Sequence, residues 1–201
     1  MLNFTGDPRT IFEQQNQKVC YTFLVNKILK KEPITVGLIK EIHLLLTQGI
    51  FDQKRFIEND ERPGQFKKHD YVVGFYGVGE PPEAIEEMMQ ELIDEIAVES
   101  KNILKVAAYF HSQFEYLHPF ADGNGRVGRT LLNYYLMINN YPPLIIFDED
   151  KRLYYEALEA YDSKEDIEPL YLFLEYESMK TWKKQLERYL HLTENEWGQE
   201  R

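Results

Sequence analysis

A short segment in the second half of the chain gathers residue types that bind phosphate. Gly123-Asn124-Gly125 places two glycines around an asparagine, just before a predicted helix. Glycines let successive backbone N–H groups point at one bound group without interference from a Cβ, and a helix start favours anions. Arg126 and Arg129 lie three positions apart, so they share one face of that helix, where guanidinium groups can pair with phosphate oxygens. The pattern predicts a polyphosphate cradle.

Two acid–base residues precede this cradle. Asp122 stands directly before the first glycine, where a carboxylate suits either a magnesium ion shared with phosphates or the cap of the following helix. The spacing alone leaves both roles open. His118, four residues earlier, titrates near neutral pH and can take a proton from an attacking hydroxyl. The other four histidines are interpreted as structural: His43, His69, His111 and His191.

The same segment contains a G-x-G-x-x-G pattern, from Gly123 to Gly128. In dinucleotide-binding proteins this pattern follows a strand and opens a β-α-β unit. Here the preceding residues, 110–117, have a helical pattern, and no parallel-sheet alternation follows. The context therefore argues against a dinucleotide-binding fold.

The elements that must position these residues are mostly helical, because apolar residues recur every three or four positions through most of the chain. Residues 52–70 are polar and are predicted to form a loop. Residues 71–76 are rich in β-branched and aromatic residues beside glycines, which indicates a short hairpin. The predicted helices cover residues 9–29, 35–47, 82–98, 100–116, 126–139, 151–161 and 167–192.

Composition limits the class of protein. The chain has 201 residues, with 23 basic and 34 acidic side chains and a net charge of −11, which argues against a nucleic-acid-coating role. The apolar runs are too short for a membrane span. The N-terminus lacks the layout of a signal peptide, and the single cysteine, Cys20, cannot form an internal disulfide. We expect one mostly helical domain in the cytoplasm.

The segment from His118 to Arg129 resembles the signature of the Fic family, H-P-F-x-[DE]-G-N-G-R-x-x-R. All nine specified positions among the twelve match. Further likeness lies in Arg62-Pro63-Gly64, in the predicted hairpin and in the segments at Tyr141-Pro142-Pro143 and Tyr154, so that it covers roughly residues 10–190. The resemblance implies an all-α Fic fold over residues 1–201, a helical bundle with a small β-hairpin flap, about residues 70–80, beside the active site.

The resemblance also implies an activity, the transfer of AMP from ATP to a Ser, Thr or Tyr hydroxyl of a target protein, with self-modification included. His118 would be the general base, Asp122 would hold Mg²⁺, and Asn124 with the glycine amides would stabilise charge at the α-phosphate. The remaining phosphate- and ATP-binding positions of the motif are Gly123, Gly125, Arg126, Val127, Gly128 and Arg129.

The predicted flap would cover the nucleotide and align the target by backbone pairing. Its edge comprises Val73, Gly74, Phe75 and Tyr76, and Tyr154 falls where family members contact the nucleobase side. The resemblance leaves the target protein and homo-oligomer formation open.

Gly125 distinguishes branches within the family. The kinase-like branch that resembles Doc carries lysine at this position, so glycine favours AMP transfer over phosphate transfer. The alternatives are a Fic enzyme with another donor, such as UTP or CDP-choline, one that removes AMP, or a nucleotide-sensing domain without activity.

Many Fic proteins carry an inhibitory helix with the pattern [ST]-x-x-x-E-[GN], whose glutamate pairs with the second motif arginine. No Ser or Thr of this chain has glutamate four positions later. Glu13 is the nearest candidate, but Arg9 stands where the hydroxyl residue should be. We therefore expect Arg129 to be unopposed, with any brake supplied by an antitoxin-like partner or by a segment ahead of Met1.

Overall fold

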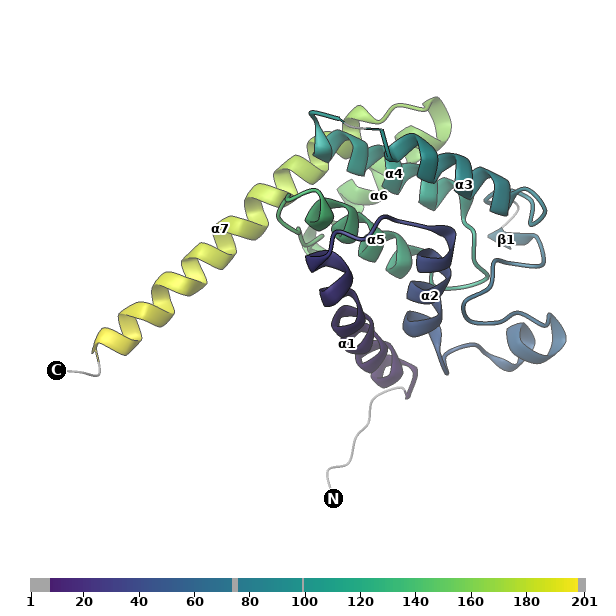
Figure 1. Cartoon of the computed structure of the whole chain (residues 1–201), viewed down its shortest axis with the longest axis horizontal. Helices are drawn as coiled ribbons and strands as arrows, with labels where there is room; N and C mark the ends of the chain where they lie inside the picture. The colour runs from purple at the N-terminus through teal and green to yellow at the C-terminus, as the bar shows by residue number, and fades with distance from the viewer. Residues whose placement is uncertain (1–7, 74–75, 99, 199–201) are drawn as a thin grey trace, which may run out of the picture. The chain divides into compact units, whose positions relative to one another are not determined.

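Helices form where the sequence repeats apolar residues at helical spacing, as a computed structural model of the chain shows (Figure 1). The structure describes residues 8–73, 76–98 and 100–198. The chain folds into two compact units, Met1–Tyr141 and Pro142–Arg201.

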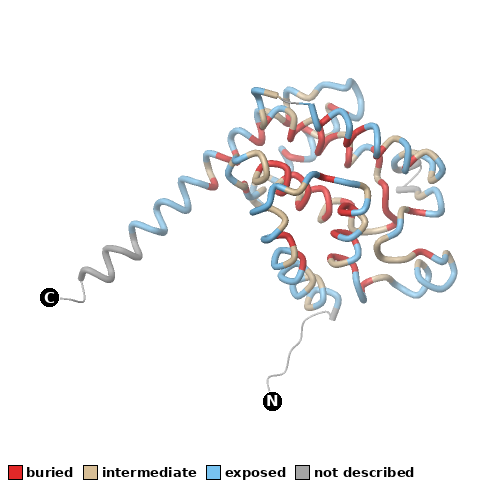
Figure 2. The backbone as a smooth tube through the Cα atoms, in the orientation of Figure 1, coloured by how far each residue is buried: buried red, intermediate tan, exposed pale blue. Residues whose placement is uncertain are grey.

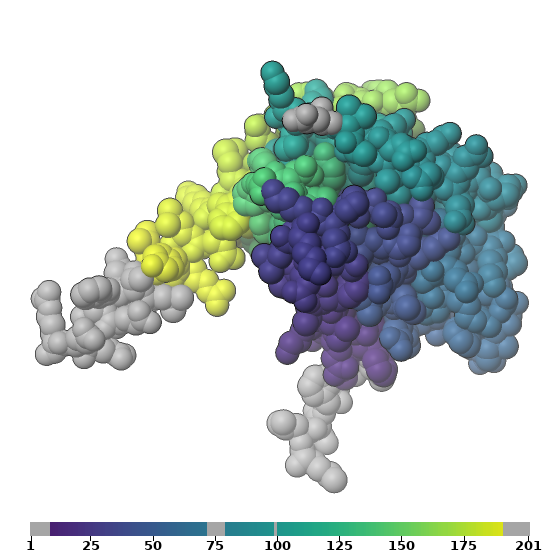
Figure 3. Space-filling model, viewed as in Figure 1, coloured from purple at the N-terminus to yellow at the C-terminus, as the bar shows by residue number. Residues whose placement is uncertain are grey.

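The first unit begins with two packed helices, α1 (Pro8–Leu29) and α2 (Val36–Thr47). Pro33 lies in the link between them, where its ring opposes helix continuation. The Thr35 hydroxyl then caps α2 by accepting a hydrogen bond from the Leu38 N–H at 3.1 Å. In Figure 3 these two helices, purple to dark blue, form a continuous surface on the viewer's side of the first unit.

The core of the first unit is built by α3 (Ile85–Ile96), α4 (Ile103–Leu117) and α5 (Asn124–Ile138). α5 packs against α4 and also contacts α1 and α2, so it is the central helix of the unit. Figure 2 shows buried residues along both α4 and α5, and Phe110 and Leu131 are fully buried. The loop between these two buried helices carries the phosphate-type segment.

Between α2 and α3 the chain makes a turn and two short strands. Residues Lys54–Glu58 form one turn of π-helix within the predicted loop, because the Asp52 carboxylate accepts the Arg55 N–H at 2.8 Å at its start. The strands β1 (Tyr71–Val73) and β2 (Tyr76–Val78) pair antiparallel, with Val73 opposite Tyr76.

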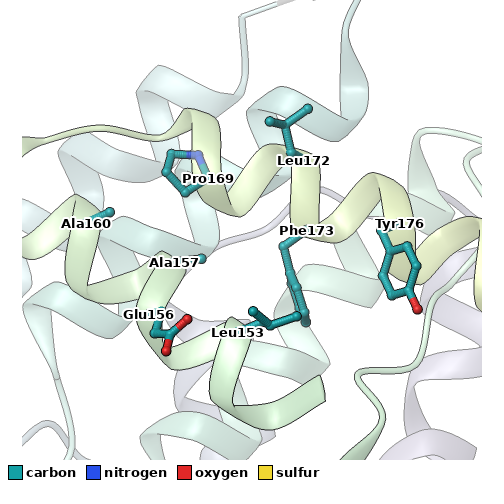
Figure 4. A pocket seen from close by; sticks show the side chains of 8 residues that line it. All are labelled: Leu153, Glu156, Ala157, Ala160, Pro169, Leu172, Phe173 and Tyr176. Carbon is teal, nitrogen blue, oxygen red and sulfur yellow. The ribbon is translucent and has the colours of Figure 1, made fainter. Parts of the chain in front are cut away.

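The second unit contains α6 (Lys151–Lys164) and the long α7 (Glu168–Gly198), which pack against each other, preceded by a 3₁₀ turn at Asp148–Asp150. An apolar groove of about 430 Å³ lies between the two helices. Figure 4 shows its lining, with Leu153, Glu156, Ala157 and Ala160 from α6 and Pro169, Leu172, Phe173 and Tyr176 from α7.

The predicted mostly helical class is confirmed. All seven predicted helices are present, with ends that differ by a few residues; α5, for example, begins at Asn124 rather than Arg126. A single Fic domain over residues 1–201 stays a prediction. In the part of the chain that the structure describes, no helix is both long enough and apolar enough to cross a membrane.

Candidate active site

The loop from Leu117 to Gly123 connects α4 to α5, and its first residues are tied to both ends of the β1–β2 hairpin. The Lys67 N–H, ahead of β1, donates to the Pro119 carbonyl at 2.9 Å. The Glu80 N–H, just after β2, donates to the Leu117 carbonyl at 3.1 Å. The hairpin is thus anchored on either side of His118, which itself caps α4 in the left-handed conformation with φ of 47°.

Gly79 makes this close approach feasible. A Cβ at this position would lie 2.4 Å from the His118 Cβ and 2.4 Å from the Leu117 carbonyl oxygen, and the glycine has φ of 76°. Only a residue without a side chain fits there. The segment that follows β2 therefore lies directly against the Leu117 carbonyl and the Cβ of His118, the residue predicted to be the general base.

His118 is held as a neutral imidazole. Burial, and after it the charge of Lys67, lowers the pKa of His118 to about 4. Lys67 is only 3% exposed, and burial lowers the pKa of its ammonium group as well. A neutral imidazole at physiological pH can accept a proton from a hydroxyl group.

The start of α5 is shaped by Gly123 and Asn124. Gly123 precedes the helix with φ of 85°, a conformation that glycine adopts without strain. The buried Asn124 side chain accepts a hydrogen bond from the Phe120 N–H at 2.9 Å and donates one to the Phe120 carbonyl at 2.7 Å. Both amide atoms of Asn124 thus hold the loop, and its contact with the α-phosphate stays a prediction.

Asp122 lies in a network of four alternating charges that joins α1 to α5. Its carboxylate accepts from Arg9 at 2.8 Å and lies 3.4 Å from a terminal nitrogen of Arg126. Glu13 in turn contacts both arginines, at 3.0 Å from Arg9 and 3.2 Å from Arg126. The Asp122 side chain is 16% exposed. The Glu13 contact with Arg126 was not expected from the sequence.

Arg129 differs from Arg126 in its surroundings. Within the described residues, no carboxylate oxygen lies within ion-pair distance of its guanidinium. A Cβ added to Gly125 would meet the Arg129 Nη1 at 3.1 Å, so this guanidinium lies over the glycine at the helix start. A larger residue at position 125 would have to displace it.

The two remaining motif residues, Val127 and Gly128, are buried. A Cβ at Gly128 would lie 2.3 Å from Glu115 Oε1 and 3.1 Å from the Phe114 ring, so this glycine allows α5 to approach α4 closely. Their side-chain positions serve packing. A contact of either residue with ATP stays a prediction.

The other predicted site residues fall in different places. Val73 ends β1 and Tyr76 begins β2, whereas Gly74 and Phe75 lie outside the described residues. Tyr154 belongs to the second unit, where it is 2% exposed and its ring lies 5.9 Å from that of Phe173. Its role toward the nucleobase stays a prediction.

Four residues that lie around the site were not assigned to it from the sequence: Arg9, His43, Glu61 and Lys67. His43 is fully buried against the loop, as its structural interpretation required, yet it contacts Phe120 and Asp122 directly. Glu61 is 1% exposed and accepts hydrogen bonds from the Lys68 N–H and the Tyr71 hydroxyl, at 3.0 and 2.9 Å, ahead of β1. Long-range contacts of this kind leave no local periodic signal.

Asp122 also fits the predicted magnesium site. A single carboxylate beside phosphate-binding residues suits an ion that takes most of its oxygens from phosphates and water. The Asp122 carboxylate already attracts the guanidinium of Arg9, and it stands immediately before the helix start and the arginines that suit phosphate.

Comparison with known proteins identifies the family. Residues 33–136 match the model of the Fic/DOC family. The chain belongs to the Fic/DOC family. A protein adenylyltransferase Fic of Nematostella vectensis is 33% identical over 150 residues, which cover 73% of this chain and 33% of the relative. A protein of the same name from Drosophila mojavensis is 30% identical over 147 residues, covering 70% of this chain and 29% of the relative.

Solved structures of other Fic proteins share the fold. Fic-1 of C. elegans superposes with a TM-score of 0.77 at 24% identity, covering 98% of this chain and 56% of that chain. A Fic-domain signalling protein of Bacteroides thetaiotaomicron has a TM-score of 0.74 at 22% identity, covering 88% of this chain and 71% of that chain. The present chain spans about a third of the length of the curated relatives it matches.

Proposed function

We propose that the protein is an adenylyltransferase, which moves AMP from ATP to a Ser, Thr or Tyr hydroxyl of a target protein. The observation that supports this proposal is the neutral, part-buried His118 at the start of the loop that leads to Gly123 and the N-terminus of α5, where an anion would be favoured. The names of the relatives from Nematostella and Drosophila support the same activity.

The chemistry is a displacement at the α-phosphorus of ATP. The target oxygen forms a bond to this phosphorus, the bond to the bridging oxygen of the β-phosphate breaks, and pyrophosphate leaves. The proton of the hydroxyl passes to the imidazole of His118, which is unprotonated before the reaction. Mg²⁺, when bound at Asp122, would neutralise charge on the phosphates.

The residues at the start of α5 would stabilise the negative charge that develops on the phosphates during the transfer. At the start of α5 the Arg126 and Val127 N–H groups donate to the Gly123 carbonyl, so the N–H groups of Asn124 and Gly125 would be the ones that face the phosphates. Arg126 and Arg129 would bind the β- and γ-phosphates. Arg126 must exchange its contact with Glu13 for phosphate oxygens, whereas Arg129 has no such contact among the described residues to give up.

The β1–β2 hairpin would act as the flap. Its two ends are hydrogen-bonded to the residues flanking His118, so a peptide that pairs with its edge would bring a hydroxyl toward the imidazole. Val73 to Tyr76 would form this edge, and Tyr154 would contact the base of the nucleotide. We place this activity in a single Fic domain acting in the cytoplasm, a setting that suits the one cysteine.

The proposal is tested by incubating the purified chain with ATP, Mg²⁺ and a cell lysate. Mass spectrometry should find adenylyl groups on Ser, Thr or Tyr of one or a few proteins, and His118→Ala should abolish them. Modified proteins found equally with the His118→Ala variant would contradict the assignment.

The alternative donors and the reverse reaction are separated by competition. Excess unlabelled ATP should suppress labelling, and excess UTP or CDP-choline should not. Removal of AMP from a modified target would instead appear as loss of label without added ATP. If the protein were instead a nucleotide-sensing domain without activity, it would bind nucleotide and transfer no group to any target.

The contact of Glu13 with Arg126 bears on regulation of the site. Because Glu13 leaves Arg129 unopposed among the described residues, we propose that the wild-type chain is active without removal of this glutamate. Incubating the wild-type chain and Glu13→Gly with labelled ATP tests this proposal. A silent wild type that gains labelling on Glu13→Gly would contradict the proposal and identify Glu13 as the brake, and a silent pair would direct the search to an antitoxin-like partner.

A further inference from the structure

His43 lies beneath the loop that carries the candidate site. The residue is fully buried in α2, and its imidazole stacks on the Phe120 ring with centroids 3.7 Å apart and planes 9° from parallel. The Phe51 ring meets the imidazole edge-on at 6.0 Å. These contacts fix the plane of the imidazole, and through it the position of the Phe120 side chain in the loop.

Both nitrogens of this imidazole have partners. The Gly64 N–H donates to Nδ1 at 2.8 Å, so Nδ1 is the unprotonated nitrogen. The proton therefore sits on Nε2, which lies 3.0 Å from the Asp122 carbonyl oxygen and donates to it. One side chain thus joins three separate segments of the first unit: α2, the turn at Gly64 and the site loop.

The Asp122 carbonyl is consequently held by His43 of α2, while Asn124 holds the Phe120 backbone within the loop. A carboxylate can meet a metal ion and its phosphates only if its own backbone is fixed, because a shift of about 1 Å at a reacting centre can cost on the order of 100-fold in rate. The hydrogen bond to the Asp122 backbone oxygen comes from His43, a buried side chain that is stacked on Phe120.

We propose that His43 is a positioning residue of the active site, whose Nε2–H and ring face hold Asp122 and Phe120 in the arrangement that receives the metal-bound nucleotide. This role rests on the proposed function for the meaning of Asp122. A purely structural role would make both hydrogen bonds of His43 matter equally for nucleotide binding and kcat. The positioning role assigns the effect on these two quantities to the hydrogen bond with Asp122 alone.

Three substitutions separate the contacts of His43. The amide N–H of His43→Gln can reach the Asp122 carbonyl as Nε2–H does. The shorter side chain of His43→Asn can place its amide oxygen like Nδ1 to accept from the Gly64 N–H, but it is too short for its own N–H to reach the Asp122 carbonyl. His43→Phe retains stacking on Phe120 and removes both hydrogen bonds. Tyr134→Phe serves as the control, because it removes another buried hydrogen bond, from the Tyr134 hydroxyl to the Glu32 carbonyl at 2.7 Å, away from the loop.

The measurements are thermal unfolding, calorimetric binding of a non-hydrolysable ATP analogue with Mg²⁺, and labelling rates. We expect His43→Asn and His43→Phe to weaken Mg²⁺-dependent binding and kcat by about 10- to 100-fold. His43→Gln should stay within about threefold of wild type, although its Tm falls as far as that of His43→Asn. Equal losses in the Gln and Asn variants, or full activity of folded His43→Phe, would overturn the proposal, as would a comparable loss in Tyr134→Phe.

A wild-type measurement keeps the test decisive if the variants unfold. In ¹⁵N-labelled protein, the His43 imidazole should show the Nε2–H form, with a slowly exchanging proton whose resonance shifts when the Mg²⁺–analogue complex is added. An unshifted resonance at saturation would overturn the proposal. Failure of the proposed function is recognised separately, because binding and resonance shifts would then occur in a wild-type protein that labels no target.

Discussion

At the scale of single residues, the site combines a neutral base with a concentrated set of charges. His118 is kept unprotonated by burial and by Lys67, while Asp122 stands between two arginines. The charged groups are thus paired with one another, and His118, acting as the proposed base, would take a proton without first losing one. With the ordinary imidazole pKa of 6.5, part of the His118 population would instead be protonated at slightly acidic pH.

The pH dependence of the reaction should show the lowered pKa of His118. Since a general base works in its unprotonated form, kcat/KM should stay level from pH 8 to about pH 5 and fall by half near pH 4, where the free protein's imidazole becomes protonated. Labelling rates at low ATP concentration measure this profile. A midpoint near 6.5 would show that His118 is not perturbed or is not the base.

At the scale of elements, the first turns of α1 take part in the site. Arg9 and Glu13 lie one helical turn apart and supply a cation to Asp122 and an anion to Arg126. These are the charges that Mg²⁺ and phosphate would bring. Both side chains remain about a third or more exposed, at 42% and 32%, so the contacts can be exchanged for ligands at little cost.

Removing the Arg9 guanidinium, which would compete with Mg²⁺ for the Asp122 carboxylate, should strengthen Mg²⁺ binding. Arg9→Ala is expected to lower the Mg²⁺ concentration for half-maximal labelling by about two- to fivefold, the effect of an exposed ion pair. Arg152→Ala is the matched control, because Arg152 forms an exposed pair with Glu156 on α6, also four residues apart. An unchanged or higher Mg²⁺ requirement in Arg9→Ala would show that its contact with Asp122 does not oppose the metal.

The different surroundings of two helical glycines predict opposite effects of adding a Cβ. Gly128→Ala should destabilise the protein by about 1–3 kcal/mol, since its Cβ would collide with Glu115 and crowd Phe114. Gly37→Ala, on the exposed side of α2, meets only Thr35 at 3.8 Å and should stabilise by up to about 1 kcal/mol. Urea unfolding gives both values. A neutral Gly128→Ala would contradict the close packing of α4 on α5, and a destabilising Gly37→Ala would contradict the open surroundings of Gly37.

At the scale of the whole molecule, buried histidines couple the fold to pH. Burial lowers the pKa of His43 to about 4 and that of His111 to about 3, from an ordinary value of 6.5. Between pH 6.5 and 4 the unfolded chain therefore binds more protons than the folded one, so stability is lost as the pH falls through this window.

The free energy of unfolding should consequently drop between pH 7 and pH 5 by about 2 kcal/mol for each of these two histidines. Urea titrations at the two pH values measure the drop, and His111→Phe should reduce it. A stability that is flat or rises toward pH 5 would contradict the burial of neutral imidazoles.

Sequence reasoning reached the helices and the motif, because both are local patterns. The spacing of apolar residues gave the helical class, and the residues from His118 to Arg129 gave the cradle and its loop. Contacts between segments that lie far apart in the sequence could not be predicted from local patterns. Arg9 lies 113 residues from Asp122, and His43 lies 79 residues away, so neither could be assigned to the site before the fold brought them together.

The structure adds roles that the motif pattern did not reveal. Asn124 also holds the loop through Phe120, and Gly128 allows α5 to pack closely on α4, while their contacts with a nucleotide stay predictions. These roles depend on which way each residue faces, and this follows from the packing of α5 on α4 rather than from the spacing.

The position of the label in ATP distinguishes AMP transfer from phosphate transfer. The purified protein is incubated with Mg²⁺ and lysate, and with ATP labelled at either the α- or the γ-phosphate. We expect proteins to become labelled from α-labelled ATP only, pyrophosphate to be released, and His118→Ala to lose the label. Transfer of label from γ-labelled ATP, or labelling that survives His118→Ala, would contradict this expectation.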